Sequence, residues 1–142
     1  MAAAKGQSKK APRKPDDFDA VFARLRSILV PHAQTLAAHS EAPGYYYLET
    51  REPLYKGRPV YFAGVRTGKS YVSFHLMPVY AFPELRRGLS PALRKRMQGK
   101  SCFNFTTVDD GLFEELAQLT ATGAQGFPET MLRGIVAGAR CD

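Results

Sequence analysis

The sequence contains few cysteines and no long apolar run, and each shortage excludes a class of protein. Two cysteines, Cys102 and Cys141, cannot build a disulfide framework and lack metal-ligand spacing, so both are expected as reduced thiols. No apolar run approaches the roughly 20 residues that are needed to cross a bilayer. The first 15 residues also lack the apolar core of a secretory signal. These absences predict a cytoplasmic protein that makes no membrane contact.

Positive charge is unevenly distributed along the chain. The formal net charge is +7, and residues 1–15 hold five Lys or Arg and no acid. This segment, rich in Ala, Lys and Pro, cannot bury enough apolar area to order itself, so residues 1–15 are predicted to form a disordered basic tail. Such a tail offers weak, salt-sensitive contact to nucleic acid. The remaining residues, 16–142, have the usual size of a single folded domain.

A second basic region lies inside the predicted domain. Residues 51–100 contain eleven Lys or Arg, but only Glu52 and Glu84 as acids. Because acids gather before and after this region, the folded domain is predicted to be electrostatically polarised. A basic surface attracts phosphates or carboxylates, although scattered charges on solvated faces give the same pattern.

Hydrophobic periodicity predicts helices at both ends of the domain. Apolar residues recur at steps of three and four from Phe18 to Leu29, which is typical of one face of an amphipathic helix. Pro31 is expected to end or kink this helix, and Leu36 and Ala37 are interpreted as its continuation. Further helices are predicted over 82–88, over 90–99, from near Asp109 to Gly123, and from Pro128 onward.

Aromatic and alternating segments predict four strands, at 45–50, 60–65, 71–77 and 101–106. Between the second and third strands, the sequence GVRTGKS (64–70) resembles a phosphate-binding loop. That loop needs four residues between its first Gly and the Gly-Lys pair, and then a helix. Only three residues separate Gly64 from Gly68, and a strand is expected after Ser70. The segment is therefore predicted to be a hairpin turn with a positive φ at Gly68.

Strands joined by tight turns pair antiparallel, which predicts an α+β fold with helices packed on one face of a small antiparallel sheet. Alternate residues of each strand and the apolar stripes of two helices should then meet in one core. The predicted core residues are Phe22, Leu25, Leu29, Phe62, Val72, Phe74, Leu76, Phe103, Phe105, Phe113 and Leu116.

The outward face of the sheet and the adjoining basic helix form the predicted ligand-binding site. Residues 71, 73, 75 and 77 alternate with core residues, and tyrosines at 45 and at 46 or 47 are expected beside them. A tyrosine offers an apolar ring with a polar tip, which suits a groove for a small ligand or a peptide. Helices covering this face would instead make it a second core layer. The predicted ligand-binding residues are Tyr71, Ser73, His75, Arg94, Arg96 and Lys100.

Three alternatives remain open beside this non-enzymatic, cofactor-free interpretation. Cys102 and His75 would form a thiol nucleophile if their strands were neighbours, although a buried cysteine is commonly just a small apolar residue. Acids at positions 109, 110 and 114 offer oxygen ligands to a metal, although carboxylates in the first turn of a helix also favour its dipole. The basic, aromatic region 51–100 has the ingredients of a single-strand nucleic-acid reader.

Two runs, YVSFHLMPVY (71–80) and SPALRKRMQGKSCFNF (90–105), resemble small bacterial proteins of unknown function grouped with the YdhG-like domain. The resemblance reaches from about Tyr45 to Leu119 and implies an α+β domain. One branch is described as resembling frataxin, an intracellular iron chaperone that hands iron to cluster or haem assembly. This role implies exposed acids, and the candidates in this sequence are Asp16, Asp17, Asp19, Asp109, Asp110, Glu114 and Glu115.

Overall fold

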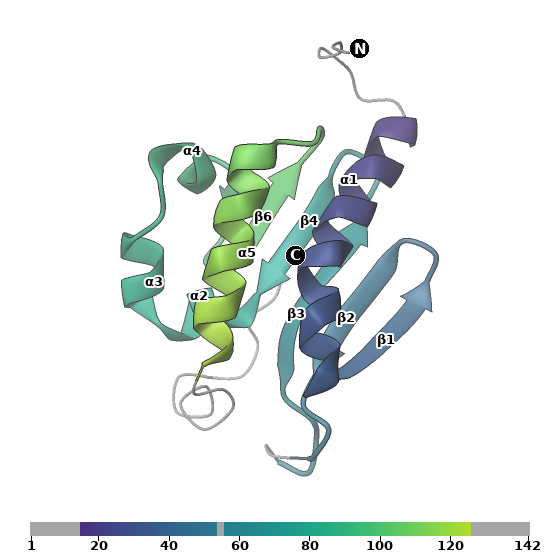
Figure 1. Ribbon diagram of the computed structural model, residues 1–142, viewed down its shortest axis with the longest axis vertical. Helices are drawn as coiled ribbons and strands as arrows, with labels where there is room; N and C mark the ends of the chain where they lie inside the picture. The colour runs from purple at the N-terminus through teal and green to yellow at the C-terminus, as the bar shows by residue number, and fades with distance from the viewer. Residues whose placement is uncertain (1–14, 54–55, 126–142) are drawn as a thin grey trace.

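The computed structural model describes residues 15–53 and 56–125 (Figure 1). The predicted helix from Pro128, most of the basic tail and Cys141 lie outside these residues. The described elements are, in chain order, α1 (Pro15–Leu29), the 3-10 turn η1 (Val30–Gln34), β1 (Ala37–Ala42), β2 (Tyr45–Glu49), β3 (Tyr61–Thr67), β4 (Val72–Leu76), α2 (Met77–Ala81), α3 (Pro83–Arg87), α4 (Pro91–Arg94), β5 (Met97–Gln98), β6 (Cys102–Phe105) and α5 (Asp110–Ala124).

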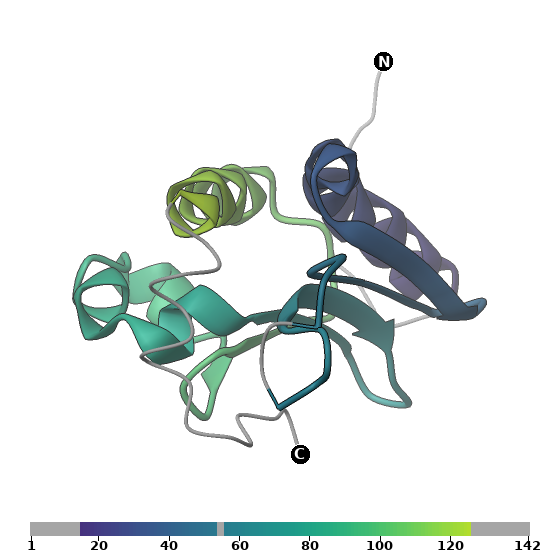
Figure 2. The ribbon, with the colours of Figure 1, turned by 90° about the horizontal axis from the view of Figure 1, so that it is seen from below.

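One sheet of six strands organises the domain. The strand order is β1-β2-β3-β4-β6-β5, and every neighbouring pair is antiparallel. Helices α1 and α5 lie side by side over one face of this sheet (Figures 1 and 2). The expected α+β class, with helices packed on a small antiparallel sheet, is therefore confirmed.

The apolar stripe of α1 explains how this helix attaches to the sheet. Val21, Leu25 and Leu29 are fully buried, and their spacing of four residues keeps them on one side of the helix. Pro31 follows directly in the 3-10 turn, where its missing N–H cannot continue the α-helical ladder. Leu29 is accordingly the last residue of α1.

The core between the sheet and the two long helices contains the residues that the sequence pattern predicts. Strand β4 alternates buried and half-buried residues, with Val72, Phe74 and Leu76 on the core side. Of the predicted core set, only Phe22 is partly rather than fully buried, and it packs against the others. Fully burying a side chain such as Phe74 contributes about 1.5–3 kcal/mol to folding.

Four local predictions are wrong. The helix predicted over 90–99 ends at Arg94, and Met97–Gln98 forms strand β5 instead. The segment that begins at Ala37 is not a continuation of the first helix but the edge strand β1, which pairs with β2. Met77 is not on the outward sheet face, because it opens α2 and is buried. The hairpin between β3 and β4 is present, yet Gly68 does not have a positive φ; within the described residues, positive φ values occur at Lys56, Gly57 and Gly99.

Side-chain caps fix the beginnings of helices α4 and α5. The hydroxyl of Ser90 accepts a hydrogen bond from the backbone N–H of Leu93 at 3.1 Å, and it donates to Glu115 at 2.7 Å. Asp109 accepts from the N–H of Leu112 at 3.1 Å and so caps α5. The contacts to Leu93 and Leu112 each satisfy a backbone N–H that the first turn of a helix leaves unpaired. Among the described helices, none is long and apolar enough to span a bilayer.

Gly123 marks the closest approach of α5 to α2. A Cβ atom at this position would lie 2.7 Å from Cβ of Pro78 and 2.8 Å from its Cγ. A Gly-to-Ala change in a helix normally stabilises it by up to about 1 kcal/mol. We expect Gly123→Ala to lower the free energy of unfolding instead, by about 1–3 kcal/mol, because the proline ring cannot move aside without shifting backbone.

The matched control for this prediction is Gly111→Ala in the same helix. Its added Cβ would meet no atom closer than Oδ1 of Asp109 at 3.7 Å, which is ordinary contact. Denaturant unfolding should show Gly111→Ala to be neutral or stabilising. Equal effects of the two substitutions would contradict this account of the contact between α2 and α5.

Candidate functional site on the outer face of the sheet

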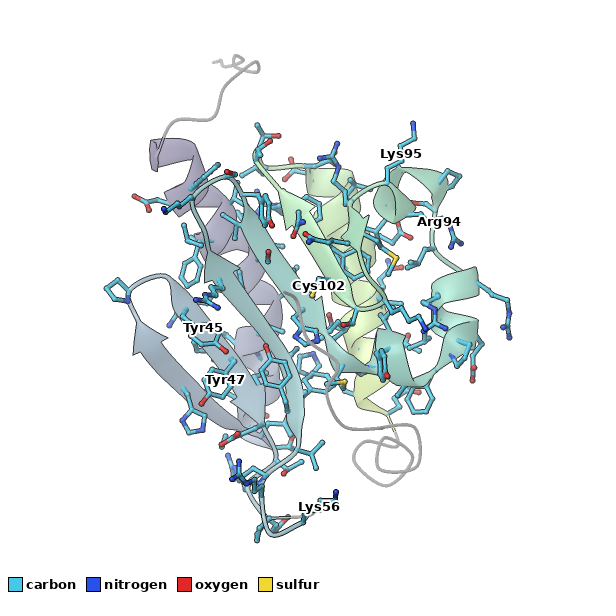
Figure 3. The ribbon with its side chains drawn as sticks, turned by 180° about the vertical axis from the view of Figure 1, so that it is seen from behind. Tyr45, Tyr47, Lys56, Arg94, Lys95 and Cys102 are labelled. Carbon is cyan, nitrogen blue, oxygen red and sulfur yellow. The ribbon has the colours of Figure 1, made fainter. Side chains whose placement is uncertain are left out.

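The face of the sheet opposite α1 and α5, here called the outer face, carries the predicted ligand-binding side chains of β4. Figure 3 views it directly, and no described helix crosses its centre. Ser73 and His75 are half-buried and alternate with the core residues of the same strand. The prediction that Ser73 and His75 face away from the core is therefore confirmed.

A chain of polar contacts crosses one part of the outer face. The hydroxyl of Ser73 donates to Oδ1 of Asn104 at 2.8 Å, and the amide of Asn104 donates to Oε1 of Gln98 at 2.6 Å. The hydroxyl of Tyr71 donates to the same Gln98 oxygen at 3.3 Å. Tyr71 and Ser73, which were predicted as ligand-binding residues, are thus brought together through β6 and β5.

The neighbouring part of the outer face carries an aromatic row across four strands. His39, Tyr47, Gly64 and His75 lie directly opposite one another on β1, β2, β3 and β4. Side chains at such paired positions share one face of the sheet. The glycine leaves a gap in this row, and the ring of Tyr61 fills it.

A β-bulge brings Tyr61 to that gap. On β3, Leu48 pairs with Ala63 and Glu49 with Tyr61, so Phe62 is an extra residue in the ladder. Residues three apart in a regular strand point to opposite faces, but the bulge puts Tyr61 on the same face as Gly64. A Cβ atom at position 64 would collide with the hydroxyl of Tyr61 and would lie 2.9 Å from Cβ of Tyr47.

The rings of this row contact one another in sequence. The ring centroids are 4.9 Å apart for His39 and Tyr47, 5.7 Å for Tyr47 and Tyr61, and 4.9 Å for Tyr61 and His75. Interplanar angles of 23° to 37° make these contacts stacked or tilted. Because each inner ring covers its neighbours, the row presents ring edges rather than open ring faces.

Tyr45 extends the aromatic row as far as Arg66 of β3. Its ring centroid lies 5.2 Å from that of Tyr47, and the guanidinium carbon of Arg66 lies 5.5 Å from the Tyr45 ring centroid. Tyr46, in contrast, is buried on the core side, with Arg26 over its ring at 4.9 Å. The tyrosines beside the predicted site are therefore Tyr45 and Tyr47.

Burial shifts the pKa values of Tyr61 and His75 in the direction that keeps both side chains uncharged. Desolvation raises the pKa of Tyr61 far above its ordinary value, and the nearby phenols of Tyr45 and Tyr47 add to the effect. Desolvation also lowers the pKa of His75 to about 4. Nε2 of His75 is buried without a hydrogen-bond partner, which leaves one polar atom of the row unsatisfied.

His39 occupies the end of the row on the edge strand. Its Nε2 atom lies 2.9 Å from Oε2 of Glu49, which is within ion-pair distance. The same atom is not satisfied as a hydrogen-bond donor, because the ring N–H does not point at the oxygen. The two atoms are therefore close, but we do not describe their contact as a hydrogen bond.

The three predicted cations lie beyond β6 and are exposed. Arg94, at the end of α4, donates a hydrogen bond to the backbone oxygen of Arg86 at 2.9 Å, so part of its guanidinium holds α3 against α4. Arg96 and Lys100 flank the short strand β5 (Figure 3 labels Arg94 and Lys95 in this region). These cations are therefore at the border of the outer face and not in its centre.

Cys102 is brought directly opposite His75 by the pairing of β4 with β6. The neighbouring strands that the thiol alternative requires are thus present. Cys102 is only 1% exposed, however, and the described residues include no free cysteine. The expectation of a reduced thiol at Cys102 is therefore wrong, and the thiolate nucleophile needed by the enzymatic alternative is not provided.

Each acid of the predicted metal set has a structural contact. Asp109 caps α5, Asp110 pairs with Arg24 at 2.6 Å, and Glu114 accepts a hydrogen bond from Gln118 at 3.3 Å. Within residues 15–53 and 56–125, no group of three or more His, Cys, Asp or Glu is arranged to hold a metal ion. Iron binding through these acids stays a prediction.

The sequence did not indicate Tyr61, Gly64 or His39 as parts of the site. Gly64 was interpreted within a turn signature, and regular alternation would put positions 61 and 64 on opposite faces of the strand. Ala37 was interpreted as part of the first helix, so the strand that carries His39 was not expected. The sequence shows only a glycine three residues after an aromatic residue. That spacing puts the two residues on the same face only because of the bulge at Phe62.

Comparison with known proteins finds no matching family model, no matching curated protein and no matching solved structure. The resemblance to the YdhG-like domain consequently stays a prediction.

We expect Gly64→Ala to disrupt the aromatic row. The new methyl group would displace the Tyr61 ring and press on Cβ of Tyr47, which the backbone of β2 holds in place. The free energy of unfolding should fall by about 1–3 kcal/mol, and the near-ultraviolet circular dichroism of the tyrosines should weaken. Unchanged stability and an unchanged tyrosine signal would show that the gap above Gly64 is not filled as described.

The depressed pKa of His75 predicts a loss of stability in mild acid. The folded-state pKa of about 4 lies below the ordinary value of 6.5, so the unfolded state binds more protons between these values. The contribution is fully present above pH 6.5 and is lost as the pH falls toward 4. Each unit of separation between the two pKa values corresponds to about 1.4 kcal/mol.

The variant His75→Phe provides the comparison, because it keeps a ring beside Tyr61 but cannot titrate. Unfolding should be measured for both proteins at several pH values from 7 to 4. The difference between wild type and variant should change in this interval and be constant above it. Parallel stability curves would contradict the predicted proton linkage.

Proposed function

We propose that the protein is a non-enzymatic binding protein that holds a small, uncharged, polar ligand on the outer face. The observation that carries this proposal is the unsatisfied Nε2 atom of His75, which ends a row of aromatic side chains on β4. A buried polar atom without a partner costs free energy, and a ligand atom that bonds to it recovers that cost.

The stacking within the row favours hydrogen bonding over ring stacking as the mode of recognition. Tyr47 and Tyr61 are each flanked by other rings, so a planar ligand cannot insert between them without separating the stack. The ring nitrogen of His75 at the edge of this stack can instead donate to or accept from a ligand that lies across the strands. Neutral side chains at these positions favour an uncharged ligand.

The polar contacts of β4, β5 and β6 give the ligand a second set of partners. Tyr71 and Asn104 both donate to Oε1 of Gln98, and Ser73 donates to Asn104. These side chains hold one another in place before any ligand arrives, which lowers the entropy cost of binding. Arg96 and Lys100 are at the border, where they would affect ligands that also carry an anionic group.

Chemical-shift mapping with a set of small neutral polar fragments, including amides and polyols, tests this proposal. Fragments that bind should shift the backbone signals of β3, β4 and β6, and His75→Phe should weaken them by about tenfold or less, as expected for one lost hydrogen bond. Tyr80→Phe is the matched control, because Tyr80 is a half-buried tyrosine in α2 outside the row. Fragment binding confined to other surfaces, or unaffected by His75→Phe, would contradict the proposal.

A peptide of a protein partner, iron carried by the acids near α5, and nucleic acid held by the basic tail stay predictions from the sequence. None of the described contacts favours them over a small polar ligand. The same fragment mapping includes the acids of α5, so a response there would be detected independently of the outer face.

A further inference from the structure

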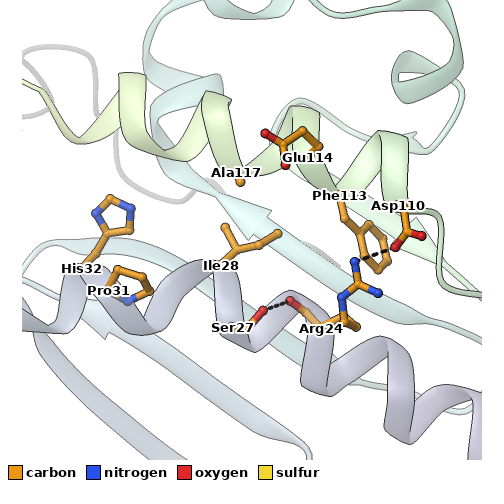
Figure 4. Close-up of a pocket in the computed structure, with 9 residues that line it drawn as sticks. All are labelled: Arg24, Ser27, Ile28, Pro31, His32, Asp110, Phe113, Glu114 and Ala117. Atoms are coloured by element: carbon orange, nitrogen blue, oxygen red, sulfur yellow. Dashed lines mark hydrogen bonds and ion pairs between the residues drawn. The ribbon is translucent and has the colours of Figure 1, made fainter.

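A cleft of about 360 Å³ lies between α1 and α5, on the side of the sheet opposite the aromatic row. Its lining comes from α1, the following 3-10 turn and α5 (Figure 4). Ile28, Pro31, Phe113 and Ala117 supply its apolar surface. A volume near the lower end of the usual range for ligand pockets suits a small molecule rather than a large cofactor.

Two polar groups at one end of the cleft neutralise each other. Arg24 forms an ion pair of 2.6 Å with Asp110, and its guanidinium carbon lies 5.8 Å from the ring centroid of Phe113. The hydroxyl of Ser27 is also occupied, because it donates to the backbone oxygen of Arg24 at 2.6 Å. The Arg24–Asp110 pair therefore closes this end without adding net charge (Figure 4).

The remaining charge of the lining belongs to Glu114. Its recorded hydrogen bond is to the neutral amide of Gln118, and the ion pairs among the described residues do not include it. His32 lies at the other end of the cleft, where burial lowers its pKa and keeps the ring uncharged at neutral pH. The lining thus has a net charge of about −1, although the whole protein has a formal charge of +7.

We propose that this cleft binds a small organic cation: a protonated amine attached to an apolar body. The ammonium group would pair with Glu114, and the apolar body would lie along Ile28 and Ala117 between the two helices. An aliphatic or aromatic body covers apolar surface that is otherwise in contact with water, while the carboxylate selects the charge. This site is independent of the outer face, since the sheet separates the two.

Titration with three probes of the same shape tests the proposal: phenethylammonium, the neutral 2-phenylethanol and the anionic 3-phenylpropionate. Amide signals of Ser27, Ile28 and Ala117 should shift with phenethylammonium, less with the alcohol and least with the anion. An exposed charge pair contributes about 1 kcal/mol or less, so Glu114→Gln should weaken the cation by up to about fivefold. The response to the alcohol should not change.

Glu84→Gln is the matched control, because Glu84 is an exposed acid of α3 that does not line the cleft. This variant should leave all three titrations unchanged. Ala117→Met, which fills the cleft from α5, should abolish the shifts of Ser27 and Ile28 with every probe. Equal responses to cation and anion, or binding of the cation unaffected by Glu114→Gln, would overturn the proposal. The absence of any shift in the cleft would overturn it as well.

Discussion

Strand β4 lies between β3 and β6, and its strict alternation of side chains separates the two environments of the domain. Val72, Phe74 and Leu76 face α1 and α5, while Ser73 and His75 face the other way. A shift of one residue in the pairing of this strand would exchange the two sets. The core and the outer face are therefore specified together, and the burial of three apolar side chains is what holds His75 in its row.

Several charged side chains in this protein make hydrogen bonds that stabilise helix ends. Arg86 donates to the backbone oxygens of Val79 and Tyr80, at 2.8 and 3.1 Å, and so binds the end of α2. Glu115 accepts from both the N–H and the hydroxyl of Ser90. Charged residues that look like a binding surface in the sequence are thus partly used to close helix ends. Among the acids near the start of α5, Glu114 is the one whose described contact is with a neutral side chain in the same helix, so it is the better candidate for contact with a ligand.

Much of the architecture was predictable because it depends on short-range patterns. The period of two in β4, the spacing of Val21, Leu25 and Leu29 in α1, and the Ser-Pro start of α4 each correspond to one local structure. Strand β1 was not predictable in the same way. Ala37 to Ala42 is rich in alanine, which favours a helix, and its pairing with β2 overrides that preference.

The candidate sites were predictable only in part, since they depend on contacts between distant segments. The side of β4 that carries Ser73 and His75 follows from alternation alone. The aromatic row also requires the register of four strands, which no single segment contains. The cleft requires α1 and α5 to lie next to each other, although Arg24 and Asp110 are 86 positions apart along the chain, so no local pattern in the sequence shows it.

The bulge at Phe62 determines which face of the sheet Tyr61 occupies. Two residues separate Tyr61 from Gly64, which would put them on opposite faces of a regular ladder, but the bulge puts them on the same face. Loss of Phe62 would restore a regular ladder and leave the phenol on the outer face, but it would remove a side chain that is fully buried in the core. The segment is consequently far less tolerant of a deletion than of a conservative exchange of side chains.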